Sequence, residues 1–127
     1  MLPRSLVFVA FALSMLAVGC RKSGEERLTG LWRGNHVEGV TPEQEPAARA
    51  FAIETELHFR DGAIMVKTPK STSMCAFKVA QTEKNMVTVI TDLDGPSNPQ
   101  TFDFADDETM HWLVVPGKRI TFHRVSQ

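Results

Sequence analysis

Apolar and polar residues alternate with a period of two along most of this chain, from Leu28 to Val125. Successive side chains of a strand point to opposite faces, so this period is typical of strands with one buried face. The clearest segment is Phe51–Arg60, because a helix would scatter its apolar residues around the whole circumference. The predicted inward face of that strand consists of Phe51, Ile53, Leu57 and Phe59.

Turn-forming residues divide the pattern into short segments. Asp61-Gly62 directly follows the segment above and is a strong hairpin signal, since both residues tolerate positive φ. The predicted strands are Leu28–Gly34, Phe51–Arg60, Ala63–Thr68, Cys75–Ala80, Met86–Thr91, Gln100–Phe104, Thr109–Val115 and Lys118–Val125. Short strands at regular spacing without a long helical pattern predict an all-β fold. We expect a small eight-stranded antiparallel up-and-down barrel, because closure removes the exposed edges of an open sheet.

Only one connection between the predicted strands is long. It covers Asn35–Arg49 and carries Pro42 and Pro46. Thr41-Pro42 can begin one helical turn, which Pro46 is then expected to interrupt. The segment is a candidate lid over one mouth of the barrel.

The first nineteen residues, Met1–Gly19, have a different character. Arg4 supplies a positive start, and Leu6–Val18 then runs thirteen residues with only Ser14 polar. That length suits an export signal and is shorter than the roughly 20 residues needed to span a bilayer as a helix. We therefore expect a cleaved signal peptide.

Leu16-Ala17-Val18-Gly19-Cys20 resembles the lipobox of bacterial lipoproteins, with Ala17 where that family most often has leucine. The resemblance implies cleavage after Gly19 and lipidation of Cys20 by a diacylglyceryl group and a fatty acid such as palmitate. Two or more acyl chains anchor a protein stably to a membrane. Arg21 rather than aspartate follows the cysteine, which implies the outer membrane, with the domain facing the periplasm. The polar residues 20–27 are expected to form a flexible tether.

Composition limits the partners of the mature domain, which is expected to cover residues 28–125. The whole chain has 127 residues and a formal charge of −1, and its basic residues are scattered. This balance argues against nucleic acid as a partner. With Cys20 lipidated, Cys75 has no intramolecular partner, and we expect it to be buried as a small hydrophobe.

Gly30-Leu31-Trp32 on the first predicted strand and Arg124 on the last form a Gly-x-Trp and arginine pairing. This pairing resembles that of the lipocalin-like, or calycin, barrels, and more closely the small lipocalin-like domains of bacterial lipoproteins. The chain is shorter than true lipocalins and lacks their C-terminal helix. The resemblance implies that Trp32 and Arg124 close the base of the barrel through a cation–π contact.

An aromatic-rich inner face leaves two possibilities for the interior of the barrel. An eight-stranded barrel is just wide enough to be filled by side chains or to hold one small ligand. The residues expected to line such a ligand are Phe51, Phe59, Phe77, Phe102, Phe104 and Trp112.

No constellation of residues predicts catalysis. The four histidines lack the converging ligands of a metal site, Asp92-x-Asp94-Gly95 is better explained as a turn, and no cofactor motif is present. The first hypothesis is a non-enzymatic, membrane-anchored lipoprotein that binds a small apolar ligand in its barrel. The alternative is an envelope protein-interaction module, such as an assembly factor or enzyme inhibitor, with a filled barrel.

Overall fold

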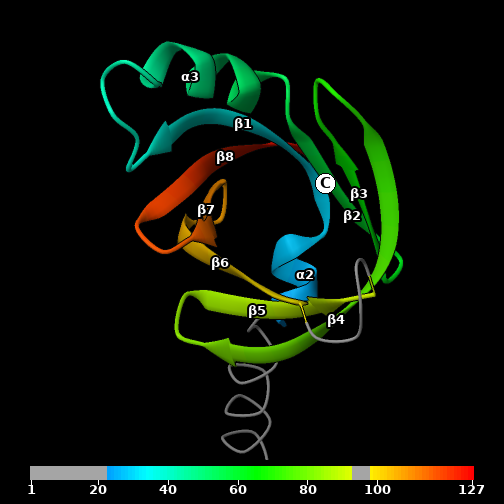
Figure 1. Cartoon of the computed structure of the whole chain (residues 1–127). Coiled ribbons are helices and arrows are strands. Elements are labelled where there is room, and N and C mark those ends of the chain that lie inside the picture. The colour runs from blue at the N-terminus through cyan, green and yellow to red at the C-terminus, as the bar shows by residue number, and fades with distance from the viewer. Residues whose placement is uncertain (1–22, 93–97) are drawn as a thin grey trace, which may run out of the picture.

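The computed structural model of the chain describes residues 23–92 and 98–127, so the predicted signal peptide and Cys20 lie outside the described residues. Within these described residues, eight antiparallel strands close into a barrel in sequence order, as predicted (Figure 1). The strands are β1 (Gly30–Glu38), β2 (Glu56–Arg60), β3 (Ala63–Lys67), β4 (Thr72–Glu83), β5 (Met86–Thr91), β6 (Asn98–Asp106), β7 (Thr109–Val115) and β8 (Lys118–Ser126). Each strand pairs with its neighbours in sequence, which makes the barrel an up-and-down meander.

β1 closes the barrel by pairing on both of its edges. Trp32 lies opposite Leu57 of β2 and opposite Arg124 of β8. Closure satisfies the backbone groups of the first and last strands, which would otherwise be exposed as edges.

Aromatic side chains fill much of the interior. The ring of Phe59 meets those of Phe77 and Phe102 edge to face, with centroids 5.4 and 5.5 Å apart. Trp32 meets Phe104 in the same way at 5.9 Å. Such edge-to-face pairs are favourable beyond the apolar area that they bury.

The sequence prediction is wrong for the segment before β2, where Glu45–Ile53 forms helix α3 instead of the start of a strand. Pro46 lies in the first turn and begins this helix rather than interrupting it, because the amide of a first-turn residue needs no intrahelical partner. Phe51 and Ile53, predicted to face the core, are instead 37% and 49% exposed. Within the described residues, neither helix has the length and apolar character to cross a membrane.

α3 packs along β1 (Figure 1) at a glycine. A Cβ atom at Gly34 would fall on the backbone carbonyl of Ala52, which is fully buried. We expect Gly34→Ala to lower the free energy of unfolding by about 1–3 kcal/mol, since overpacking of this size forces backbone shifts. Chemical denaturation measures the loss. Gly62→Ala is not a suitable control because of its positive φ, so Ala63→Ser on the outer face of β3 serves instead, and an equal loss in both would contradict the packing argument.

The expectation of a flexible tether through Arg27 is also wrong, because Gly24–Leu28 forms helix α2. Ser23 and Glu26 make a capping box, in which the Ser23 hydroxyl accepts from the Glu26 amide at 3.2 Å and the Glu26 carboxylate accepts from the Ser23 amide at 3.4 Å. Reciprocal bonds of this kind satisfy two backbone donors that a helix start leaves free.

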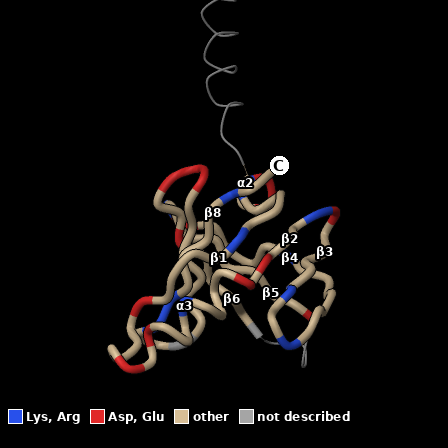
Figure 2. Tube along the Cα trace, turned by 90° about the horizontal axis from the view of Figure 1, so that it is seen from above, with Lys and Arg blue, Asp and Glu red and all other residues tan. Residues whose placement is uncertain are grey.

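The barrel has two distinct ends. The α2 end carries α2, the β2–β3 turn at Asp61-Gly62 and the C-terminal residue Gln127 (Figure 2). The distal end is the opposite one, where β1 ends at Glu38 beside the β7–β8 turn at Pro116-Gly117.

Candidate functional site

The α2 end is closed by the two residues that the family resemblance singled out. The guanidinium carbon of Arg124 lies 4.2 Å from the centre of the Trp32 ring, and Trp32 is fully buried. The Arg124 guanidinium also donates to three backbone carbonyls, those of Asp107, Thr29 and Arg27, at 3.1, 2.6 and 2.7 Å. The structure thus brings the predicted pair together, and it adds hydrogen bonds that the sequence did not indicate.

α2 completes this closure. The Trp32 indole N–H donates to the carbonyl of Leu28 at 2.8 Å, and the Leu28 side chain is fully buried. The Arg27 guanidinium lies over the Phe104 ring at 4.4 Å. The helix therefore acts as a plug, so a ligand can enter the barrel only elsewhere.

A small cavity remains inside the barrel on the side away from α2. Its volume is about 100 Å³. Its walls are formed by Leu57, Ile64, Val66, Cys75, Val89, Thr91, Gln100, Phe102 and Trp112. Of the six predicted lining residues, only Phe102 and Trp112 contribute. Phe59, Phe77 and Phe104 belong to the packed core, and Phe51 lies outside the barrel on α3.

The polar groups of the cavity wall are already occupied or weak. The Trp112 indole N–H donates to the Gln100 side-chain carbonyl at 2.8 Å. Cys75 is a free, buried thiol, as expected, and burial raises the pKa of this thiol. A protonated thiol is a poor nucleophile and metal ligand, so Cys75 serves the cavity as an apolar wall.

The size of the cavity limits what it can hold. Typical ligand sites have volumes of about 300–1,000 Å³, and an engineered apolar cavity of about 150 Å³ accepts benzene. A volume of about 100 Å³ is smaller than either and suits only a few heavy atoms.

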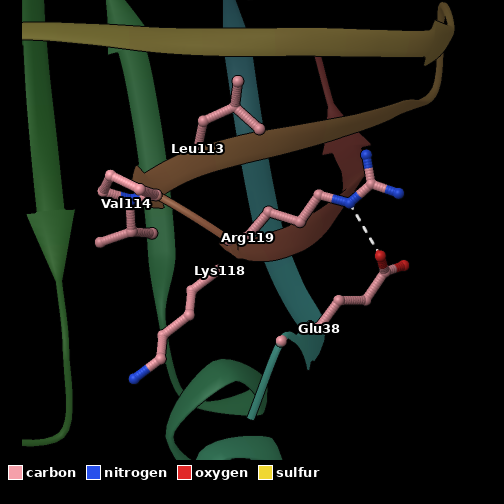
Figure 3. Close-up of a pocket in the computed structure, with 8 residues that line it drawn as sticks. Glu38, Leu113, Val114, Lys118 and Arg119 are labelled. Atoms are coloured by element: carbon pink, nitrogen blue, oxygen red, sulfur yellow. Dashed lines mark hydrogen bonds and ion pairs between the residues drawn. The ribbon is translucent and has the colours of Figure 1, made fainter.

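A larger depression lies on the surface at the distal end (Figure 3). It has a volume of about 560 Å³ and is open to solvent. Its walls come from β1, β7 and β8 and from the turn that joins the last two, and comprise Glu38, Gly39, Leu113, Val114, Pro116, Gly117, Lys118 and Arg119. We call this feature the distal cleft.

Charged and apolar side chains are neighbours in the distal cleft. The Arg119 Nε–H donates to the Glu38 carboxylate at 2.8 Å, and this bond lowers the pKa of the Glu38 carboxyl. Figure 3 shows the Lys118 side chain pointing away from that ion pair. Val114 is 41% exposed despite its apolar side chain. Exposed apolar side chains beside charged side chains, only some of which form ion pairs, are typical of protein-binding sites.

A histidine cluster on the outer face of β1, β7 and β8 was not foreseen from the sequence. His111 Nδ1 lies 2.9 Å from the Thr121 hydroxyl, and His36 Nε2 lies 3.5 Å from the same hydroxyl. His111 and Thr121 lie on the consecutive strands β7 and β8, whereas His36 lies 85 residues before Thr121, so only the closure of the barrel through β1 brings it to them. Among the described residues, no three metal-ligating side chains converge.

The burial of His111 makes stability depend on pH. Burial lowers the pKa of His111 below its ordinary value of 6.5, and the nearby Arg119 lowers it further. The unfolded chain therefore binds more protons than the folded protein just below pH 6.5, so the free energy of unfolding should fall as pH drops through that region.

Denaturation between about pH 5.5 and 8 measures this effect, since the lowered pKa values of Glu38 and Glu56 act only near and below 4.5. His111→Gln should flatten the pH dependence of the free energy of unfolding. Equal slopes in the native chain and His111→Gln would show that another group is responsible.

No family model matches this chain, and no curated protein or solved structure matches it either.

Proposed function

We propose that this chain is a lipid-anchored, non-enzymatic interaction module of the bacterial cell envelope, whose filled barrel presents its distal end to a protein partner. The observation that carries the proposal is the packed interior. α2 plugs one end, aromatic rings occupy the middle, and the remaining cavity measures only about 100 Å³. A barrel packed in this way works as a rigid support for its surface.

The distal cleft is the surface that we assign to the partner. It combines the exposed Val114 with the Glu38–Arg119 ion pair and the exposed Lys118. Side chains of both kinds within one concave surface can give a partner apolar contact and charge complementarity.

The anchoring part of the proposal rests on the sequence. We infer that Cys20 is lipidated and that the chain is held at the outer membrane, facing the periplasm. A distant relationship to the lipocalin-like domains of bacterial lipoproteins is also part of this inference, and the Trp32–Arg124 contact supports it.

Site-specific photo-crosslinking in the living bacterium tests the module. A photoreactive residue at Val114 should give a reproducible crosslinked protein, and one at Lys67, exposed at the end of β3, should not. Charge reversal by Lys118→Glu should reduce the Val114 product several-fold. The same products from both positions, or none from Val114, would contradict the assignment of the distal cleft.

A second candidate is binding of a very small apolar molecule inside the barrel. The apolar walls of the internal cavity favour it, since apolar cavities of comparable size bind molecules such as xenon. Native mass spectrometry of protein purified gently from membranes should then show a bound species of a few heavy atoms. Unmodified mass together with no response to xenon pressure would exclude this candidate.

A further inference from the structure

We propose that the α2 end of the barrel lies against the membrane that carries the lipid anchor, so that the domain is held in one orientation with its distal cleft pointing away. This inference rests on the lipidation of Cys20 proposed above. It adds which surface meets the lipid and which surface is free for a partner.

The first step is that the chain is fixed to the barrel from Ser23 onward. The fully buried Leu28 and the bond from the Trp32 indole to its carbonyl hold the end of α2. Arg124 holds the carbonyls of Arg27 and Thr29.

The start of α2 is fixed as well. A Cβ atom at Gly24 would lie 2.6 Å from the Thr82 hydroxyl and 3.1 Å from a Val87 methyl, so the backbone of α2 touches β4 and β5 directly. The helix is therefore part of the folded domain and does not swing as a tether.

The second step is the reach of what remains. Three residue steps separate Cys20 from Ser23, and at no more than about 3.6 Å each they span about 11 Å. The barrel itself is about 18 Å tall for strands of about seven residues with the usual tilt. A tether shorter than the barrel keeps the α2 end beside the membrane and excludes the inverted orientation, in which the distal end would lie between the α2 end and the lipid.

The third step concerns the charge of the α2 end (Figure 2), which carries both signs. The acidic residues there include Glu25, Glu26, Asp61 and the turn at 106–108, and the basic ones include Arg60 and Lys84. A mixed surface is not strongly attracted to anionic lipid. The orientation therefore follows from the short tether, and it should persist at high salt, which screens surface charges.

Two matched positions test the orientation in the full lipidated chain. In a Cys75→Ala background, Arg60→Cys at the α2 end and Lys118→Cys at the distal end each remove one exposed positive charge. Each thiol carries the same fluorophore, and the protein is reconstituted into phosphatidylethanolamine and phosphatidylglycerol vesicles with spin-labelled headgroups. We expect several-fold stronger quenching at position 60 than at position 118, at low and high salt alike.

A longer tether is the control. An insertion of about 15 Gly and Ser residues between Lys22 and Ser23 adds roughly 20 Å of reach and should remove most of the difference. Protein that floats with the vesicles but is quenched equally at both positions contradicts the orientation while leaving the anchor intact. Protein that fails to float and lacks the mass of the lipid contradicts the anchor, and the orientation with it.

Discussion

Replacing Arg124 by alanine should lower the free energy of unfolding by about 4 kcal/mol, one of the two largest losses expected for a single residue. Its side chain is only 5% exposed, and it links α2, β1 and the β6–β7 turn through three backbone carbonyls and the face of Trp32. Hydrogen bonds from charged donors contribute about 1.5–3 kcal/mol each, and a desolvated cation–π contact about 2 kcal/mol, with partial overlap between them. Urea denaturation followed by tryptophan fluorescence measures the loss.

The chain offers two controls for this experiment. Arg124→Lys keeps the positive charge without the planar fork of donors, so it should recover only part of the loss. Arg33→Ala removes an arginine whose side chain is 53% exposed and, among the described residues, forms a single ion pair, with Glu56, and should cost no more than about 1 kcal/mol. Losses of the same size for Arg124→Ala and Arg33→Ala would mean that Arg124 does not close the barrel.

The second large effect is expected for Phe102→Ala. Phe102 is 1% exposed, packs on Phe59 and Trp112, and forms part of the cavity wall. Removing a buried ring typically costs about 3–5 kcal/mol, because the surrounding core relaxes only in part. The same change enlarges the cavity, so the variant should be stabilised by benzene whereas the native chain should not. Thermal unfolding with and without benzene measures both effects.

Phe51→Ala is the matched control, since Phe51 was predicted to line the same interior and instead lies on the surface of α3. Its loss should be below about 1 kcal/mol, with no benzene effect. Benzene stabilisation of the native chain would indicate that the cavity is larger or more adaptable than its resting volume.

The strands could be predicted because their period of two is repeated over many residues and punctuated by turn signals. The Asp61-Gly62 hairpin is an example, with Asp61 at the positive φ that such a turn requires. Alternation of apolar and polar residues does not distinguish a strand from a helix when it covers only a few residues. In Phe51-Ala52-Ile53 three residues fit a strand and a helix equally well, and the position of Pro46 in the first turn decides for the helix.

The sequence analysis missed the capping box, although Ser23 and Glu26 have the required spacing. The tether was predicted because the polar residues that follow Cys20 lack an apolar period. A helix of one turn needs only Leu28 to bury, and a single apolar residue gives no period. Periodicity therefore does not predict short helices that are stabilised by tertiary contacts.

The candidate site, like the fold, could be predicted from the sequence only in part. The Trp32–Arg124 pairing was expected from the resemblance to lipocalin-like barrels, and the closed barrel places the two residues on neighbouring strands. The volume of the cavity could not, because it depends on how rings from different strands interlock. The distal cleft joins Glu38 to Arg119 across 81 residues, and the required register is shifted by irregular pairing in β1.

Because the strands form a closed ring, the chain could begin at a different strand and still form the same barrel. Ser23 and Gln127 line the same surface depression, so a short peptide could join the two ends of the domain. A circular permutant opened at Gly117, with its lipidated cysteine placed just before Lys118, would keep every strand pair and the whole core. It would carry its anchor at the opposite end of the barrel, so the domain would be inverted on the membrane. The fold and the orientation of the domain could then be varied independently.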